Sequence, residues 1–338
     1  MAISAERGTS TQMRSMLVEV AIHEGVEVCE EPLFGEGGFI KLPDGRRQYF
    51  NNYTLAINDM GAAAIARNKA VSAHFLRSAG FTVPKSEVFA VGRYDDPRSC
   101  VSLLPAARAF ACELGFPVVV KPNGLWWGLG VARAYDLSQL DIAFRAAALL
   151  DSGVLVQECL LGNDVRVVML DGELVCAYER KPLEVDGDGH SHISALLNRK
   201  LRQLESQGRR LAIELDDVRL SLCLARAGLG LWSVLPEGHS VTLLDCANMV
   251  TGGSAIDWTE SVHPSLVGLA VSIAKCASLR FCGVDLILDR RPDCAVSGYH
   301  VLEVNAAPGL EHYAALGDSQ HSRTRETLRK LLRAMNAG

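Results

Sequence analysis

The stretch that most constrains this chain is a pair of apolar runs near its C-terminal end, at residues 284–288 and 299–304. The polar segment between them contains Gly and Pro, which predicts a hairpin connection. Asp285 interrupts the first run, and Glu303 and Asn305 lie two residues apart at the end of the second. Side chains two apart on a strand point the same way, so three oxygen-bearing side chains can converge on one face of a sheet.

Oxygen ligands in that number suit Mg²⁺, which proteins usually hold with one or two carboxylates plus substrate phosphates. From these residues alone, the alternative is an edge hairpin whose charges are solvated. The hairpin therefore predicts either a metal site that also needs phosphate or an ordinary surface hairpin. The rest of the chain has to decide between them.

Composition bounds the class of protein. The chain has 338 residues, 49% apolar and 22% charged, which is typical of a globular protein with one large or two to three smaller domains. Its net charge is −5 and no run of Lys and Arg stands out, so nucleic acid is not an expected partner. The N-terminus lacks an apolar signal core, and Lys275 and Arg280 break the best candidate for a membrane helix, so no membrane partner is expected either.

The ten cysteines show neither a CxxC pair nor the His spacing typical of zinc sites. Several of them, such as Cys176, Cys223 and Cys276, lie inside apolar runs, where a buried free thiol is the usual state. We therefore expect a reduced, cytoplasmic protein.

The first part of the chain reads as a small α/β segment. Apolar spacing predicts a helix over residues 10–23, followed by a strand at 26–28. A hairpin is expected over residues 39–50, around the turn Pro43-Asp44-Gly45. A segment of this size is too small to be an enzyme alone.

Lys69 stands out in the next helix, which Asn68 is expected to cap and Gly80 to close. A cation in the first turn is poorly placed for the helix dipole, whereas a helix N-terminus favours anions. Lys69 is therefore explained if it reaches an anion such as a phosphate. The alternative is a solvated surface lysine.

A buried strand over residues 116–122 delivers Lys121 into a Gly-rich loop with Gly124, Gly128 and Gly130. Glycines permit close backbone approach, and successive N–H groups can cradle a phosphate. The loop matches neither the Walker spacing nor GxGxxG. Its tryptophans, Trp126 and Trp127, are either lid aromatics or packing residues.

Downstream, we expect helices over residues 103–114, 138–150, 193–204, 216–227, 263–279 and 318–335, and strands at 154–158 and 240–245. The apolar linker at 159–162 is a surface against which an adenine can lie. A hairpin over 164–180 carries Asp164, Arg166, Glu179 and Arg180. Arg180 ends an apolar strand, where its guanidinium is either a bidentate anion ligand or an exposed strand-end charge.

The order of these parts resembles the ATP-grasp superfamily. The motifs that carry the resemblance are the Asn-Lys helix start, FPVVVKP, the Gly-rich loop, VLVQECLLGNDVRVVMLDGELVCAYERKP, GDGHSH, ANMVTGGSAIDWTESVHP, GVDLIL and LEVNAAPGL. Within that superfamily, the chain is most similar to the ATP-grasp domains of cyanophycin synthetase and of bifunctional glutathione synthetase. The resemblance covers residues 10–310. The second enzymatic half of either protein is not in this sequence, so neither product is implied.

The resemblance implies roles for matching residues. The lysines on the ATP phosphates would be Lys69 and Lys121, beneath a flexible loop that includes Gly124, Gly128, Gly130 and Val131. Adenine and ribose would lie against Glu158, Cys159, Leu160, Leu161 and Asp164. The transferred phosphate and the acyl substrate would meet Arg166, Arg180, Asn248, Thr251, Gly252 and Gly253. Two Mg²⁺ ions would be held by Asp285, Glu303 and Asn305. The polar insert at residues 289–298 departs from the family pattern and is expected to lengthen the hairpin without moving these ligands.

We therefore expect a mixed α/β fold of the ATP-grasp type, with ATP between two of three subdomains. The boundaries would be residues 1–67 for an N-terminal segment, 68–150 for the central subdomain and 151–338 for the C-terminal one. The expected activity is ADP-forming ligation of a carboxylate to an amine, with amino acids or peptides as substrates. The alternatives are modification of a protein or peptide C-terminus, or a nucleotide-binding regulatory subunit. The oligomeric state stays open, with a homodimer as one option.

Overall fold

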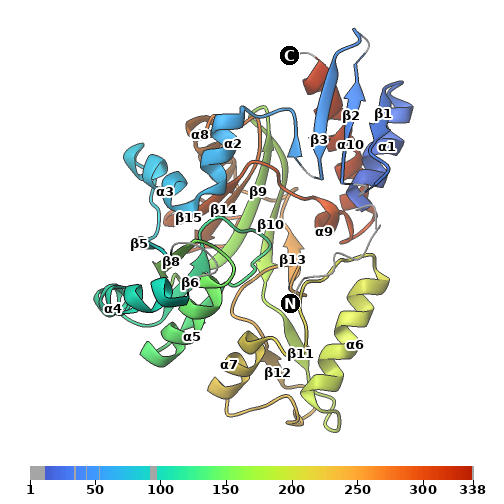
Figure 1. Ribbon diagram of the computed structural model, residues 1–338. Coiled ribbons are helices and arrows are strands. Elements are labelled where there is room, and N and C mark those ends of the chain that lie inside the picture. The colour runs from blue at the N-terminus through green and yellow to red at the C-terminus, as the bar shows by residue number, and fades with distance from the viewer. Residues whose placement is uncertain (1–11, 34–35, 43, 53, 92–96, 337–338) are drawn as a thin grey trace.

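The computed structural model describes residues 12–33, 36–42, 44–52, 54–91 and 97–336 (Figure 1). Helices and sheets are mixed along the chain, and every described strand pair is antiparallel. The expected mixed fold is therefore confirmed. None of the described helices combines the length and apolar character needed to cross a bilayer.

The central sheet has five strands, in the order β13-β10-β9-β14-β15. Their bounds are β9 Asn163–Leu170, β10 Glu173–Lys181, β13 Ser254–Asp257, β14 Phe281–Leu288 and β15 Tyr299–Asn305. The predicted hairpins over 164–180 and 284–304 both lie in this sheet. The polar insert at 289–298 connects β14 to β15, and Asp285 still pairs with Glu303 in the ladder.

Alternation along β9 sets up the two faces of the sheet. Val165, Val167 and Met169 face a core that is closed by helix α8 (Pro264–Cys276). On the other face, Val168 and Leu170 pack under the terminal helices, whereas Asp164 and Arg166 line a cavity. A period of two places these four side chains on the same face. That face is apolar where helices cover it and charged where it borders the cavity.

A second sheet has the order β5-β8-β6-β7 and is covered by two helices. Its strands are β5 Ser86–Ala90, β6 Val118–Pro122, β7 Ala132–Ala134 and β8 Gly153–Glu158, and the helices are α4 Pro97–Leu114 and α5 Leu137–Ala148. A single apolar cluster closes this unit, with Phe144 fully buried in it. Lys121 lies near the end of β6, an inner strand of this sheet.

The N-terminal part forms a four-stranded sheet that packs with both terminal helices beside the central sheet (Figure 1). The elements are α1 Gln12–His23, β1 Glu27–Glu30, β2 Gly37–Lys41, β3 Arg47–Asn51 and β4 Thr54–Leu55, with α9 Glu311–Ala314 and α10 Asp318–Asn336. The expected first helix and the hairpin are confirmed within the described residues; residues 10, 11 and 43 of these predictions lie outside them.

Two short helices link this part to the second sheet. Helix α3 (Lys69–Ser78) begins as predicted, with the Asn68 side chain accepting from the Val71 N–H at 3.1 Å. Helix α2 (Met60–Arg67), which Asp59 caps, was not predicted from the sequence. It is only eight residues long, which is shorter than the window of roughly 11–18 residues over which apolar periodicity indicates a helix.

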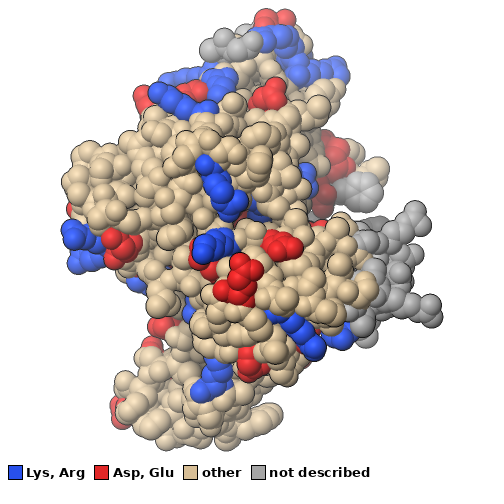
Figure 2. Space-filling model, turned by 90° about the vertical axis from the view of Figure 1, so that its left-hand side faces the viewer, with Lys and Arg blue, Asp and Glu red and all other residues tan. Residues whose placement is uncertain are grey.

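Between β10 and β13 the chain forms a separate unit with its own apolar cluster. This insert contains β11 Glu184–Asp186, α6 Ile193–Ser206, α7 Val218–Arg226 and β12 Ser240–Thr242. The two helices were predicted, but the predicted strand over 240–245 is too long, because the backbone leaves the ladder after Thr242. The insert lies at the bottom of Figure 1 and also at the bottom of Figure 2, which is turned by 90° about the vertical axis.

Asn58 ties the N-terminal part to the central sheet. Its side-chain oxygen accepts from the N–H groups of Arg280 and Phe281, at 2.8 and 3.0 Å. Its amide donates to the carbonyls of Phe281 and Ala306, both at 2.7 Å. One side chain therefore satisfies four backbone groups at the start of β14 and the end of β15.

We predict that Asn58→Ala lowers the free energy of unfolding by about 2 kcal/mol, because partly buried backbone groups lose their partners. Denaturant unfolding followed by circular dichroism measures this. The matched control is Gln203→Ala on the exposed face of α6, which should stay within about 0.5 kcal/mol of the wild type. Equal effects of the two substitutions would show that Asn58 is not a structural tie.

Candidate active site

A cavity of about 1800 Å³ lies between the second sheet, the central sheet, the insert and the N-terminal part. Most of the residues singled out from the sequence line it: Lys69, Lys121, Gly124, Gly128, Val131, Glu158, Cys159, Leu160, Asp164, Arg166, Arg180, Asn248, Asp285, Glu303 and Asn305. These residues come from segments more than 200 positions apart. The structure therefore brings together side chains that the sequence could only suggest belong to one site.

The centre of the site is a row of side chains that crosses the central sheet. In the ladders, Asp285 is paired with Arg166 on one side and with Glu303 on the other. The row continues from Arg166 to Tyr178 and then to Asp257. Directly opposed residues share a face of the sheet, so the charges in this row meet without any contribution from loops.

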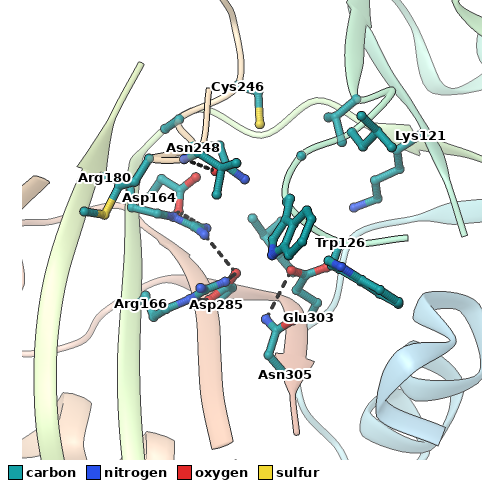
Figure 3. A pocket seen from close by; sticks show the side chains of 18 of the residues that line it. Lys121, Trp126, Asp164, Arg166, Arg180, Cys246, Asn248, Asp285, Glu303 and Asn305 are labelled. Atoms are coloured by element: carbon teal, nitrogen blue, oxygen red, sulfur yellow. Dashed lines mark hydrogen bonds and ion pairs between the residues drawn. The ribbon is translucent and has the colours of Figure 1, made fainter. Parts of the chain in front are cut away.

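Ion pairs hold this row together (Figure 3). Arg166 donates to both oxygens of Asp285 at 2.6 Å, and Arg180 reaches the same carboxylate at 3.0 Å. Arg180 also donates to Asp164, at 2.6 Å. Asp285 is only 1% exposed. A buried carboxylate requires such partners, because an unpaired buried charge is strongly destabilising.

Lys121 approaches from the second sheet, across the cavity from the arginines (Figure 3). It is 7% exposed, and its ammonium donates to the buried Gln157 side chain at 2.8 Å. Burial lowers the pKa of Lys121 to about 8, although Glu303 acts in the opposite direction. The lysine is therefore a buried cation whose described hydrogen-bond partner is neutral, which suits it to an incoming anion.

Glu303 links the row to Lys69, whose ammonium lies 3.5 Å from its carboxylate. Burial alone would raise the pKa of Glu303, but the surrounding cations, of which Lys69 is the strongest, hold it well below its ordinary value. The Asn305 amide N–H₂ donates to Glu303 at 3.2 Å, which leaves the amide oxygen of Asn305 as an acceptor. Glu303 is therefore an ionised carboxylate at neutral pH.

The donor set of Asp285, Glu303 and Asn305 fits a hard cation that also binds phosphate. The described residues contain no group of three or more His, Cys, Asp or Glu side chains arranged to hold a metal. Two carboxylates and one amide oxygen are too few for a cage made by protein alone, but they suit Mg²⁺, which keeps water and substrate phosphates as ligands. A carboxylate offers about four acceptor positions, so Asp285 can serve the arginines and still face a cation.

Five predicted site residues do not line the cavity. Leu161 is 85% exposed, and Thr251 is buried with its hydroxyl donating to the Asn248 carbonyl. A Cβ on Gly253 would lie 2.4 Å from the Lys181 carbonyl. The remaining two, Gly130 and Gly252, pack against the side chains of neighbouring elements. The close approaches that these glycines permit are to the protein itself, and any contact with a ligand stays a prediction.

The Gly-rich loop is held from two sides. Lys69 donates to the Leu125 carbonyl, and Arg219 of α7 donates to the Gly128 carbonyl at 2.9 Å. Asp217 fixes the guanidinium of Arg219 at 2.6 Å. Trp127 and Gly128 both have positive φ, and a Cβ on Gly128 would meet the Asn248 amide at 2.8 Å. The loop is therefore docked against the insert.

Sequence reasoning missed Arg219 and a second contact between the insert and the second sheet. Arg226 pairs with Asp245 at 2.6 Å and lies over the Tyr135 ring at 4.3 Å. Nothing in the sequence singles out Arg219 or Arg226, because the Gly128 carbonyl and the Tyr135 ring that they contact are distant in the chain. Gln157 had a sequence signal, because it is a polar residue directly after three apolar residues of β8, and its side chain accepts from Lys121.

Comparison with known proteins supports the same assignment. One family model, described as the C-terminus of D-Ala–D-Ala ligase, matches residues 75–188. A second, described as a RimK-like ATP-grasp domain, matches residues 246–319. The chain belongs to the ATP-grasp superfamily.

Individual relatives agree with this ATP-grasp assignment. The glutathione biosynthesis bifunctional protein GshAB of Clostridium perfringens is 29% identical over 80% of this chain and 35% of its own length. The cyanophycin synthetase of Nostoc is 31% identical over 74% of this chain and 27% of its own. A bifunctional glutathione synthetase structure from Pasteurella multocida has a TM-score of 0.60 at 25% identity, covering 98% of this chain and 45% of that one. The ATP-grasp chain thus spans less than half the length of these relatives.

The two family models match different parts of the ATP-grasp site. The first includes Lys121, the Gly-rich loop, Arg166 and Arg180, and the second includes Asp285 and Glu303. Residues 189–245, which form most of the insert and carry Arg219, lie in neither match. The contact between the insert and the loop therefore belongs to a part of this chain that the family descriptions do not cover.

We predict that the affinity for ATP falls as the pH rises through about 8, where Lys121 loses its proton. Below that pH the lysine is a cation that can pair with phosphate; above it the attraction is lost. Fluorescence titration with a non-hydrolysable ATP analogue between pH 6.5 and 9.5 measures this. Lys121→Met should bind more weakly at neutral pH and show a much smaller change through pH 8. A pH dependence equal to that of the wild type in this variant would assign the titration to another group.

We predict that Arg219→Met speeds nucleotide dissociation by about tenfold, because the Gly-rich loop loses a charge-assisted hydrogen bond. Stopped-flow displacement of a fluorescent ATP analogue reports the rate directly. Arg199→Met, on the exposed face of α6, removes the same charge from the insert without touching the loop. Similar dissociation rates in the two variants would mean that Arg219 does not retain the loop.

Proposed function

We propose that this chain is an ATP-dependent ligase that joins a carboxylate to an amine, forming an amide bond with release of ADP and phosphate. The observation that carries the proposal is the row of Arg166, Asp285 and Glu303 that faces Lys121 across one cavity. Its substrates would be amino acids or peptides. The relatives named above are glutathione and cyanophycin synthetases, which supports this substrate class.

The cavity volume supports a reaction of two bound molecules. Typical small-molecule sites enclose about 300–1,000 Å³. At about 1800 Å³, this cavity has room for a nucleotide and a second substrate together. The linker of Glu158, Cys159 and Leu160 would take the adenine, with Asp164 close to the ribose. The second substrate would then lie at the opposite end, beside the N-terminal part.

The chain's own residues would act by positioning and charge neutralisation. Lys69 and Lys121 would hold the phosphates, and Arg166 and Arg180 would hold the transferred phosphoryl group and the carboxylate. An oxygen of the carboxylate attacks the γ-phosphorus, and the bond to ADP breaks. The amine nitrogen then attacks the acyl carbon of the resulting acyl-phosphate, phosphate leaves with that oxygen, and the amine loses a proton to solvent.

Asp285, Glu303 and Asn305 would hold Mg²⁺ together with the phosphates, and we propose two such ions. When bound, Mg²⁺ supplies charge neutralisation on the phosphate oxygens. We further propose an enzyme of the reducing cytoplasm with three subdomains. The nine described cysteines are free thiols, which agrees with that compartment. The predicted boundaries were 1–67, 68–150 and 151–338, but β8 (Gly153–Glu158) pairs with β5 and β6, so the central subdomain extends to the end of β8.

The decisive experiment follows one oxygen atom. We predict that, with ATP, Mg²⁺, an ¹⁸O-labelled carboxylic acid and an amine, one labelled oxygen enters the released phosphate. The label reaches phosphate only if the carboxylate attacks phosphorus and the acyl carbon is then released. Mass spectrometry of the phosphate, alongside ADP and amide product, measures this. Unlabelled phosphate beside amide, or AMP and pyrophosphate, would rule the mechanism out.

Glu303→Gln is the control variant for that assay. It removes a charge from the candidate metal ligands and should slow ADP release by about a hundredfold or more, with the far-ultraviolet spectrum unchanged. Wild-type ADP release from this folded variant would overturn the metal assignment. A wild-type chain that binds ATP but never releases ADP with any acid and amine would instead support a regulatory subunit.

A further inference from the structure

One arm of the cavity extends beyond the nucleotide region to the N-terminal part. Helix α2 forms one wall with Met60, Ala63, Ala64 and Arg67, which recur at the spacing of one helix face. Met60 is 86% exposed, so its side chain has no described core to fill. This wall is apolar for most of its length and ends in a single cation.

The facing walls of this arm carry apolar side chains, together with the uncharged polar residues Asn51, Asn52 and Thr54. Tyr49 comes from β3, and Trp126 and Trp127 come from the Gly-rich loop. These three side chains are 64%, 46% and 50% exposed. The segment that follows β15 adds Ala306 and Pro308. Exposed apolar side chains gathered around one recess indicate a binding surface more often than chance exposure.

The charged residues that the chain from 49 to 69 contributes to this arm are all cations, and Lys69 meets the carboxylate of Glu303 at the inner end. Among the described residues from 49 to 69 that line the cavity, none is acidic, and the cations are Arg67 and Lys69. The Arg67 guanidinium lies over the Trp126 ring, 4.9 Å from its centre. Within the described part of the chain it makes no hydrogen bond or ion pair. Stacking fixes the plane of this group and leaves its N–H edges available to a carboxylate.

Lys69 connects this arm to the reaction centre. Its ammonium lies 3.5 Å from Glu303 and also donates to the Leu125 carbonyl, next to Trp126. Arg67 and Lys69 would therefore attract a donor carboxylate inward to the phosphate end of the site, where Arg166 and Arg180 would hold it. The remaining atoms of the donor would run along α2 towards Met60 and Tyr49.

We propose that this arm selects a carboxylate donor with an uncharged, apolar body, such as an aromatic or branched aliphatic acyl group. The proposal rests on the ligase function proposed above and names its substrate class. A charged body would have to give up water against Met60 and Ala64 without gaining a partner, which is unfavourable. An aromatic body would instead pack against Tyr49 and Trp127.

Binding tests the proposal without requiring turnover. The probes are N-acetylphenylalanine, N-acetylglutamate and Nα-acetyllysine, titrated by calorimetry into the full chain loaded with Mg²⁺ and a non-hydrolysable ATP analogue. We expect N-acetylphenylalanine to bind at least about tenfold more tightly than either charged acid. Equal or tighter binding of a charged acid, or no binding of any of the three, would overturn the proposal.

Two matched variants locate the preference. Ala64→Glu places a carboxylate on the exposed cavity face of α2 and should weaken N-acetylphenylalanine binding by about tenfold while leaving the affinity for the ATP analogue unchanged. Ile65→Glu places the same charge on an exposed position of α2 that does not line the cavity, and should change neither affinity. Equal loss in both variants would contradict a recognition role for this face.

ADP release with the same three acids and a mixture of amino acids as amines separates this proposal from the ligase function. Selective binding of N-acetylphenylalanine without ADP release from any acid would support the recognition arm while removing the proposed activity. ADP and amide formed from N-acetylglutamate but not from N-acetylphenylalanine would keep the ligase function and overturn the substrate class.

Discussion

The site depends on keeping one carboxylate ionised inside the protein. Asp285 is almost fully buried in the middle of a five-stranded sheet, where an unpaired negative charge would cost about 3–5 kcal/mol. The strand pairing places Arg166 directly opposite Asp285. Arg180, on the next strand, also reaches the Asp285 carboxylate. Pairing of strands β9, β14 and β10 is therefore tied to pairing of charges. A slip of one residue in either ladder would turn these side chains to the apolar face.

This arrangement explains why the remaining cations come from other units of the fold. Lys121 ends a strand of the second sheet and Lys69 begins a helix, so neither belongs to the central sheet. The Gly-rich loop spans the gap and is held by Lys69 on one side and by Arg219 of the insert on the other. Movement of the second sheet relative to the central one would change the distance between these cations and the row. A rigid row with cations on separate units suits a site that closes on its substrate.

Much of this could be predicted from the sequence, for identifiable reasons. Alternation along 299–305 is enough to place Glu303 and Asn305 on one face, and the hairpin predicted around 289–298 brings Asp285 beside them. A lysine after three valines is enough to indicate a buried cation. Helix α2 was not predicted because its eight residues are too few for apolar periodicity to indicate a helix, although Asp59 before them is a usable cap signal. Arg219 could not be found, since its contact with Gly128 joins residues 91 positions apart. The spacing of the glycines also could not show whether a glycine allows the backbone to approach a ligand or another part of the protein, as Gly253 does.

The balance of charge in the cavity sets what the site can accept. Eight Lys and Arg side chains and six Asp and Glu side chains are among the described residues that line the cavity, with Lys69, Lys121, Arg166 and Arg180 facing Asp164, Asp285 and Glu303 at its centre. Most of these charges already neutralise one another through the ion pairs described above. A triphosphate brings several further negative charges, which a surplus of two cations cannot offset, so its binding here requires added positive charge. The exposed oxygens of Glu303 and Asn305 are where that charge is most favourable. For the same reason, a donor whose body carries a further negative charge is unfavourable, whereas a donor with an uncharged body is acceptable. The apolar arm and the charged row therefore belong to one site.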